Sequence, residues 1–237
     1  VNRPRAEAIV ARAVAAGRPR LDELEALELL GAYGIPVCPA VLATTEDQTA
    51  ASSRQVGYPV VLKIVAPDIL HKTEVGGVRT DLGNEAEVRA AYRAILEGAR
   101  RVAPAAAITG VLVQRMVHGG RELIVGMNRD PLVGPLLMFG LGGVLVEVLG
   151  DVVFRLAPIT RLDARDMIQG IRGRRILEPL RGAPAVDLVA LEDVLLRVGQ
   201  LVTDLPGILD LDLNPVLARE GGALVVDARV LIGDDRE

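Results

Sequence analysis

Lysine is rare in this chain, and its two lysines stand close together. Lys63 and Lys72 are the only lysines among 27 lysine and arginine residues, and His71, one of two histidines, directly precedes the second. A lysine ammonium is a compact point charge suited to a phosphate cluster. An imidazole is nucleophilic and partly neutral at pH 7. The pattern therefore indicates phosphate chemistry; the alternative is two remaining lysines on a surface loop.

A second polar cluster is expected near the C-terminus. The turn at 219–222 predicts a hairpin, and a loop of two or four residues pairs residues whose numbers sum to 441. Asn214 then lies opposite Asp227, and strand alternation places Asp210 and Asp212 on the face of Asn214. Carboxylate and amide oxygens suit Mg²⁺. We predict a magnesium site of Asp212, Asn214 and Asp227; the alternative is a solvent-facing polar strand side.

Single residues carry weaker signals. Glu122 follows a Gly-Gly turn and suits hydrogen bonds from ribose hydroxyls, although a lone acid at a strand edge is the alternative. The pair Gly142-Gly143 could present backbone N–H groups to an anion, or could form a tight turn without a ligand. Cys38 lies in an apolar stretch and is interpreted as a core residue rather than a nucleophile.

Two common nucleotide motifs are absent from the sequence. A Walker A loop requires a glycine before its lysine, and neither Lys63 nor Lys72 follows one. The segment 140–145 has Leu145 where the dinucleotide-binding fingerprint requires its third glycine. A P-loop NTPase and a Rossmann enzyme are therefore not expected.

Composition narrows the class further. The net charge of −4, without a basic run, argues against nucleic-acid binding. The single cysteine excludes an internal disulfide and fits a reducing compartment. The most apolar window, 135–149, is too short and too rich in glycine to span a membrane. We expect a cytoplasmic globular protein.

The local patterns predict an α+β protein with two lobes. Capping-box patterns are found at Asp22 with Glu25 and at Thr45 with Gln48, and Asn84 with Glu87 opens a third helix. Further helices are expected at 164–171 and 187–204. Strands are expected at 37–42, 60–65, 78–82, 111–117, 122–128, 136–139, 144–148, 152–157, 208–217 and 223–230. The residues at 118–121 are interpreted as a hairpin turn. The predicted division is a helical segment 1–18, a first lobe 19–112 and a second lobe 113–237, with packing of the opening helix 21–33 on the second lobe as an alternative.

Five motifs in order resemble one known family. The stretches 21–37, 60–78, 113–122, 139–143 and 212–229 are together similar to the ATP-grasp β subunits and domains of ADP-forming acyl-CoA synthetases. The resemblance covers residues 19–233. It implies the ATP-grasp fold, in which two α/β lobes bind a nucleotide between them.

The resemblance implies roles for the nucleotide-site residues. Lys63 would contact the α- and β-phosphates of ATP or ADP, and Glu122 the ribose. Asn214 and Asp227 would hold Mg²⁺, while Asp212 stands where succinyl-CoA synthetases carry glutamate. The remaining implied nucleotide contacts, in the phosphate loop and the adenine-binding segment, are Lys72, Gly76, Gly77, Gln114, Met116 and Val117.

The resemblance also implies a catalytic residue and a partner. His71 matches a histidine that accepts phosphate from the CoA-binding subunit and passes it to ADP. No CoA-binding segment is found in the sequence, so activity would require a CoA-binding α subunit, in a hetero-oligomer, or a fused CoA-binding domain. Two alternatives stay open: a regulatory ATP-grasp module fused to a protein acyltransferase, and an ATP-grasp ligase joining a carboxylate to an amine, which the His71 loop disfavours.

Overall fold

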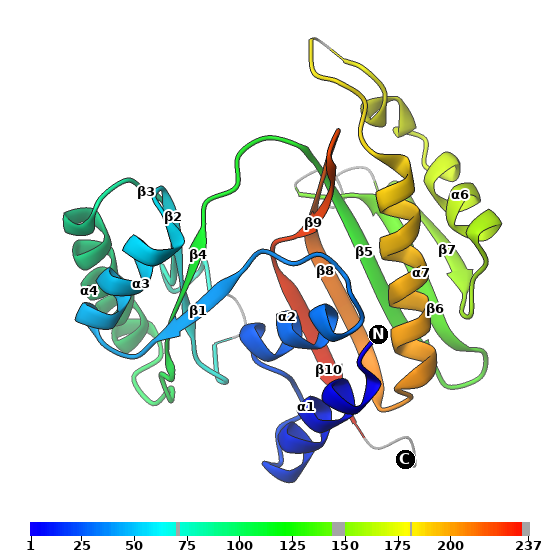
Figure 1. Ribbon diagram of the computed structural model, residues 1–237. Helices are drawn as coiled ribbons and strands as arrows, with labels where there is room; N and C mark the ends of the chain where they lie inside the picture. The colour runs from blue at the N-terminus through cyan, green and yellow to red at the C-terminus, as the bar shows by residue number, and fades with distance from the viewer. Residues whose placement is uncertain (70–71, 144–149, 181, 234–237) are drawn as a thin grey trace. The chain divides into compact units, whose positions relative to one another are not determined.

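The chain folds into two compact units. The computed structural model describes residues 1–69, 72–143, 150–180 and 182–233 (Figure 1). The larger unit combines Val1–Val37 with Gly119–Glu237, and the smaller unit is Cys38–His118. This division differs from the predicted one at 18/19 and 112/113, because the first 37 residues join the larger unit and the smaller unit continues to His118.

The smaller unit is an antiparallel sheet covered by two helices. Its strand order is β1-β4-β2-β3. The strands are β1 (Ala40–Ala43), β2 (Val60–Val65), β3 (Val78–Leu82) and β4 (Gly110–Arg115), and the helices are α3 (Glu46–Val56) and α4 (Glu85–Val102). Alternate residues of β2 (Val60, Leu62 and Ile64) belong to the hydrophobic core that this unit forms with α4.

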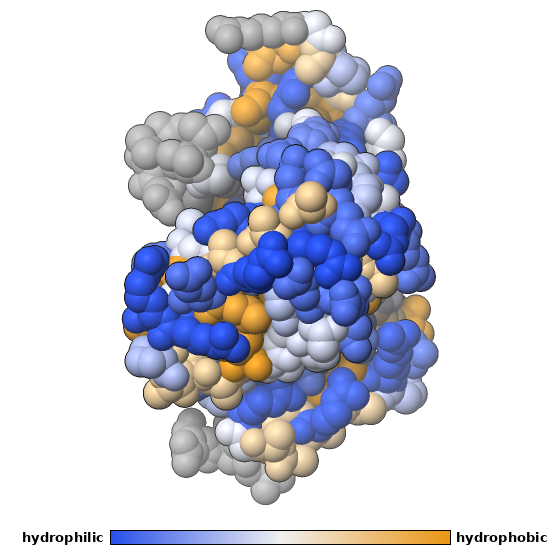
Figure 2. All heavy atoms as spheres, turned by 90° about the vertical axis from the view of Figure 1, so that its left-hand side faces the viewer, coloured by the Kyte–Doolittle hydropathy of each residue, from blue (hydrophilic) through white to orange (hydrophobic). Residues whose placement is uncertain are grey.

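Polar side chains cap both helices of the smaller unit. Asn84 accepts a hydrogen bond from the Glu87 N–H, as predicted. Thr45 caps α3 through the Gln48 N–H, but the Gln48 side chain accepts from Thr44 instead of completing the predicted box. On the outer surface Arg89 lies within ion-pair distance of acidic side chains of both helices. Figure 2 shows hydrophilic side chains over much of the face it presents.

The larger unit is built on a six-stranded antiparallel sheet. The path is β10-β8-β5-β6-β7, and β9 pairs with β8. The strands are β5 (Arg121–Asp130), β6 (Gly134–Leu141), β7 (Val152–Leu156), β8 (Ile208–Arg219), β9 (Gly222–Val225) and β10 (Ala228–Ile232). The helices are α1 (Arg3–Ala15), α2 (Glu23–Ala32), α6 (Arg161–Gly170) and α7 (Leu188–Asp204), with a 3-10 turn η1 (Arg174–Leu177). Helices α2, α6 and α7 pack against strands of the sheet (Figure 1).

Hydrogen bonds explain why residues 1–37 belong to the larger unit. The Leu21 N–H donates to the Val230 carbonyl at 3.1 Å, and the Ile232 N–H donates to the Pro19 carbonyl at 2.8 Å. The predicted capping box of Asp22 and Glu25 forms and starts α2. The C-terminal strand β10 is therefore bonded to the segment that leads into α2.

Two strand predictions are corrected by the topology. The predicted strand 37–42 is divided, since Val37 bridges Val225 in the larger unit whereas Ala40–Ala43 pairs with β4. The predicted hairpin turn at 118–121 is wrong, because β4 and β5 belong to different sheets. Both errors arise because local patterns do not identify the strand with which a segment pairs.

Two further findings concern one predicted strand and the length of the described helices. The predicted strand 144–148 lies outside the described residues. Among the described helices, none has both the length and the apolar content needed to cross a bilayer.

Gly142 is held close to a neighbouring strand. A Cβ atom at this position would lie 2.7–2.9 Å from backbone atoms of Leu123. We predict that Gly142→Ala destabilises the protein by about 1–3 kcal/mol, because the backbone must move to admit a methyl group. Gly31→Ala is the control: a Cβ there meets nothing within 4 Å, and alanine favours the α2 helix by about 0.5–1 kcal/mol. Urea midpoints followed by circular dichroism test both; equal midpoints for the two variants would contradict the packing argument.

Candidate functional site

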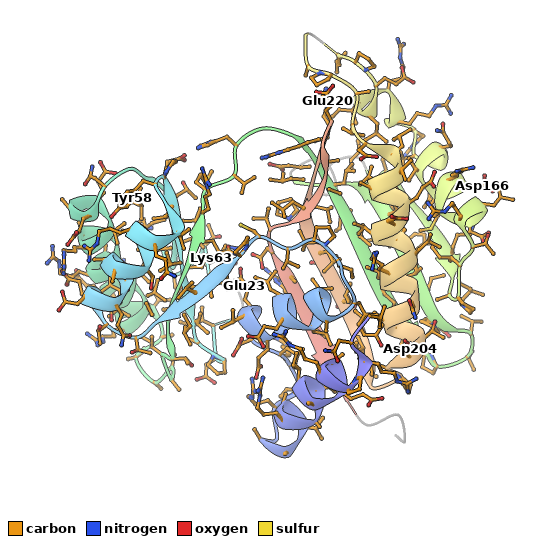
Figure 3. All side chains as sticks on the ribbon, in the orientation of Figure 1. Glu23, Tyr58, Lys63, Asp166, Asp204 and Glu220 are labelled. Carbon is orange, nitrogen blue, oxygen red and sulfur yellow. The ribbon has the colours of Figure 1, made fainter. Side chains whose placement is uncertain are left out.

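In the smaller unit, two predicted residues share one face of the sheet. Lys63 pairs with Leu112, and Gln114 with Val61, across the β2–β4 ladder. Paired residues project to the same side, so Lys63 and Gln114 are diagonal neighbours on the face opposite the core residue Leu62. Lys63 is 6% exposed and Gln114 is 1% exposed. Figure 3 labels Lys63 on the smaller unit. Burying an ammonium beside an amide costs free energy unless both groups interact with polar partners.

The loop after β2 returns to the strand through a tight turn. The Gly77 N–H donates to the Lys72 carbonyl at 2.7 Å, and the Ile64 N–H donates to the Gly77 carbonyl at 2.7 Å. Gly76 has a φ of 65°. A side chain at Gly77 would meet the Ile64 side chain, so both predicted glycines have a local structural reason. Lys72 is half-buried, and His71 lies outside the described residues.

The segment after β4 contains Met116 and Val117, two of the residues predicted to contact adenine. The Met116 N–H already donates to the Pro59 carbonyl at 2.9 Å. Met116 and Val117 are half-buried. The Met116 N–H is therefore already used within the smaller unit. Cys38 is 1% exposed, which confirms its assignment to the interior, and its sulfur lies 3.7 Å from the Arg115 carbonyl oxygen.

In the larger unit, the predicted hairpin register is confirmed. Val216 pairs with Val225 and Arg219 with Gly222, so residue numbers sum to 441. The pairs from Ala228 to Leu231 of β10 with β8 have the same sum, and they place Arg229 opposite Asp212. Between the two strands the Asn214 N–H donates to the Asp227 carbonyl at 3.3 Å. The tertiary structure thus brings Asn214 and Asp227 opposite each other, as the sequence predicted.

The polar residues of β8 occupy one face of the sheet. Leu211 and Leu213 are at most 1% exposed, whereas Asp210, Asp212 and Asn214 are half-buried. This alternation places the polar row on the face opposite these core leucines. We call it the polar face of the sheet.

The electrostatics of Asp212 fit a bound cation. Burial raises the pKa of the Asp212 carboxyl above its ordinary value; Arg229 opposes this shift, and the charges of Asp210 and Asp227 add to it. Its Oδ1 atom is buried and has no hydrogen-bond partner in the described part of the chain. A divalent cation would neutralise this negative charge and occupy the oxygen. The oxygen atoms of Asp212, Asn214 and Asp227 therefore fit a bound Mg²⁺.

The acidic, histidine and cysteine side chains of the described residues do not form a complete metal site. Over the described ranges, no three histidine, cysteine, aspartate or glutamate side chains form a metal-binding group. A cation at Asp212 and Asp227 would need the Asn214 amide oxygen together with phosphate or water ligands. That mixed oxygen set is typical of Mg²⁺ held with a nucleotide.

Glu122 lies on the same face of the sheet as the β8 polar row. It precedes the buried Leu123 and is exposed, and it pairs with Leu217. The Gly142 N–H donates to the Glu122 carbonyl at 2.8 Å, and a side chain at Gly143 would meet the Glu122 carboxylate. The two glycines therefore have a packing role beside a candidate ribose ligand. His118, considered weak, is exposed in the smaller unit, with its Nε2 atom 3.4 Å from the Asp81 carboxylate.

Three residues on the polar face were not predicted from the sequence. Gly126 pairs with Asp212 and leaves that side of the carboxylate without a neighbouring side chain from β5. Asn128 donates to the Asp210 carboxylate at 3.3 Å. Arg229, opposite Asp212, could have been found from the sum of 441. The β5 residues could not, because their register against β8 depends on a strand remote in sequence.

Comparison with known proteins agrees with these features. Residues 12–232 match a family model described as an ATP-grasp domain. Acetate–CoA ligase (ADP-forming) I of Archaeoglobus fulgidus is 48% identical over 99% of this chain and 34% of its own length. The β subunit of the ligase I of Pyrococcus furiosus is 47% identical over 96% of this chain and 98% of the subunit. The chain thus spans about a third of the first relative and nearly all of the second.

Solved structures give the same result. The dinucleotide-forming acetyl-coenzyme A synthetase 1 of Ca. Korarchaeum cryptofilum, in complex with coenzyme A and Ca-AMPCP, has a TM-score of 0.94 and 45% identity, covering 96% of this chain and all of that one. Another structure of that enzyme, with Mg-AMPPCP and its phosphohistidine segment pointing towards the nucleotide site, has a TM-score of 0.86 and 42% identity over the same shares. This chain belongs to the ATP-grasp family, with the β subunits and β domains of ADP-forming acetyl-CoA synthetases.

Proposed function

We propose that the chain is the nucleotide-binding, phosphoryl-transferring part of an ADP-forming acyl-CoA synthetase. The reaction converts acyl-CoA, ADP and phosphate into a carboxylic acid, ATP and CoA, reversibly. The observation that carries the proposal is the polar row of β8 beside Asp227 in the predicted register. Within that row Asp212 is half-buried, and its buried Oδ1 atom has no hydrogen-bond partner in the described part of the chain. The β subunit from Pyrococcus furiosus, of nearly the same length, supports it.

Positioning and charge neutralisation are the main tasks in phosphoryl transfer. Lys63, buried on a rigid strand, would hold the α- and β-phosphates as a fixed point charge. Asp212, Asn214 and Asp227 would hold Mg²⁺, which neutralises charge on phosphate oxygens when bound. Glu122 would accept hydrogen bonds from the ribose hydroxyls. Gln114, Met116 and Val117 would bind the base.

His71 would carry the phosphoryl group. A neutral imidazole nitrogen attacks the γ-phosphorus of ATP, a nitrogen–phosphorus bond forms, and the bond to the bridging oxygen breaks as ADP leaves. In the opposite direction an oxygen of the ADP β-phosphate attacks phosphohistidine and releases the imidazole. The assignment is supported by the position of His71 beside Lys72, in the loop that ends in the Gly76–Gly77 turn.

The acyl-CoA half of the reaction would require a partner. Relatives of this chain occur both as β subunits and as parts of longer ligases. We infer that a CoA-binding α subunit or a fused CoA-binding domain supplies the acyl-phosphate chemistry. The acyl substrate would then be selected by that partner.

A regulatory ATP-grasp module is the second candidate function. It would bind nucleotide without forming phosphohistidine. The complete set of Lys63, His71, Asn214 and Asp227 favours the catalytic proposal over this one.

Labelling distinguishes the two candidates. After incubation with γ-labelled ATP and Mg²⁺, alone and with a CoA-binding partner, we predict acid-labile, base-stable label on the protein. His71→Ala should abolish the label, because the acceptor nitrogen is removed. His118→Ala, which changes the other histidine, should retain it. Absence of label under both conditions would favour the regulatory module.

The two lysines should differ in their effects on nucleotide affinity. Lys63→Met keeps most of the buried volume and removes the charge, so ADP binding should weaken about 10- to 100-fold, as expected for a lost charge-assisted contact. Lys72→Met should have a smaller effect, because Lys72 is only half-buried. Isothermal titration calorimetry measures both. Unchanged affinity in Lys63→Met would remove its assigned role.

The magnesium site predicts selective effects along one strand face. Asp227→Asn and Asp212→Asn should each weaken Mg²⁺-dependent ADP binding about tenfold or more, because each removes a negatively charged ligand. Asp210→Asn changes a carboxylate two residues from Asp212 on the same face, and affinity should change less than about threefold. Titrations with and without Mg²⁺ give these ratios. The ligand assignment fails if Asp210→Asn is as damaging as Asp227→Asn.

A further inference from the structure

Arg121 is a partly buried cation to which the described residues offer no counter-ion. Its Nε atom donates to the Ile176 carbonyl at 2.6 Å. Its Nη2 atom is buried and has no hydrogen-bond partner in the described part of the chain, where Arg121 also makes no ion pair. A guanidinium keeps its charge in proteins, and a buried charge without an anion is costly. The position therefore suits an anionic ligand.

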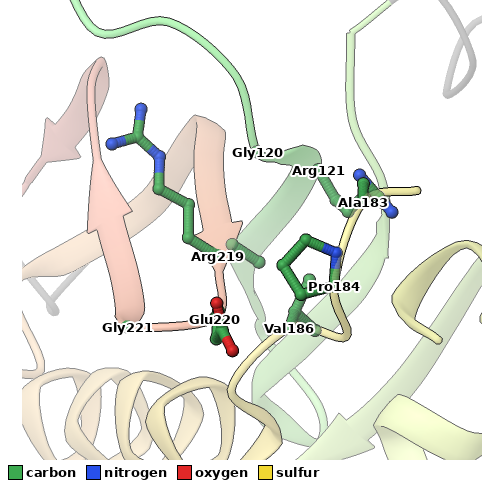
Figure 4. Close-up of a pocket in the computed structure, with 9 residues that line it drawn as sticks. Gly120, Arg121, Ala183, Pro184, Val186, Arg219, Glu220 and Gly221 are labelled. Carbon is green, nitrogen blue, oxygen red and sulfur yellow. The ribbon is translucent and has the colours of Figure 1, made fainter. Parts of the chain in front are cut away.

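Arg121 lines a pocket in the larger unit. The pocket has a volume of about 230 Å³ and lies where the start of β5 meets the β8–β9 hairpin (Figure 4). Its lining includes the apolar residues Ala183, Pro184, Val186 and Ala218. Arg219 also lines it, but in Figure 4 its guanidinium extends away from Pro184. Of the two described arginines that line the pocket, Arg121 is therefore the one placed to meet a ligand against the apolar wall.

Hydrogen bonds hold the walls of the pocket in place. The Val186 N–H donates to the Leu177 carbonyl at 3.0 Å, and the Asp187 N–H donates to the Arg219 carbonyl at 2.8 Å. A Cβ at Gly120 would lie 3.0 Å from the Ala218 carbonyl oxygen, so the backbone there lies close against β8. The pocket is therefore formed before any ligand arrives, which lowers the entropic cost of binding.

We propose that this pocket binds a carboxylate carried on a short apolar stem. Its volume is below the roughly 300–1,000 Å³ of ordinary ligand pockets, so a nucleotide is too large. A charge-assisted hydrogen bond from the guanidinium suits a carboxylate, and the apolar wall favours an alkyl stem over inorganic phosphate. Glu220, exposed at the hairpin tip, also lines the pocket, and its charge repels a multiply charged anion more strongly than a single carboxylate. A free short-chain acid and a glutamate side chain of another protein share this chemistry.

The site can be tested by titrating the full chain with butyrate, observed by ¹⁵N–¹H NMR. We expect saturable shifts of the Arg121 Nε–H signal and of the Gly120 and Ala183 amides. Butyramide, which has the same shape without the charge, should produce none. An acetylated and amidated Gly-Glu-Gly peptide forms a second arm. Tighter binding of the peptide identifies a protein carboxylate as the ligand, and tighter binding of butyrate a free acid; either supports the pocket.

Three variants separate the pocket from general effects. Arg121→Gln should weaken butyrate binding about tenfold or more, because the charged donor is lost. Ala183→Leu should weaken it by filling the pocket while Arg121 remains, and it keeps the test valid if Arg121→Gln does not fold. Arg155→Gln, a matched arginine of β7 that donates to a backbone carbonyl, should have no effect. The proposal is overturned if neither probe saturates, if butyramide binds equally, or if binding survives both pocket variants. None of these outcomes bears on nucleotide binding.

Discussion

The larger unit depends on the antiparallel pairing of β8 with the strands on both of its sides. One register, in which residue numbers sum to 441, relates β8 to β9 and then to β10. The same strand pairs with β5 on its other side. A shift by one residue would turn Leu211 and Leu213 away from the core and bring Asp210 and Asp212 into it. Burial of the leucines therefore also orients the candidate metal ligands.

Partial burial of the charged groups on the polar face costs free energy, and a bound ligand could offset that cost. Asp212 is partly desolvated near Asp210 and Asp227, and a single cross-strand arginine opposes that charge. Lys63 is buried on a strand whose other residues are all apolar. Natural proteins retain such unfavourable groups where function requires them. In each unit, at least one residue that is costly to bury, Lys63 in one and Asp212 in the other, is also assigned to nucleotide chemistry.

Several glycines of the sequence motifs have packing roles. Gly77 lies against Ile64, and Gly142 lies against the backbone of Leu123. These contacts explain why glycine occupies both positions, and no ligand is needed for that explanation. They also keep nearby groups in place, since Gly142 accompanies the Glu122 strand and Gly77 returns the Lys72 loop to β2. A glycine motif can therefore indicate a site indirectly, by allowing two backbones to approach.

The sequence by itself determined what depends on neighbours in the chain. The helix caps at Asp22 and Asn84, the hairpin with its 441 register, and hence the Asn214–Asp227 pair all follow from local rules. The tertiary structure decided which strands share a sheet. It separated β4 from β5, divided the predicted strand at 37–42, and brought Gly126 beside Asp212. Pairing between remote strands depends on burial of whole faces, and this energy is not contained in any local pattern.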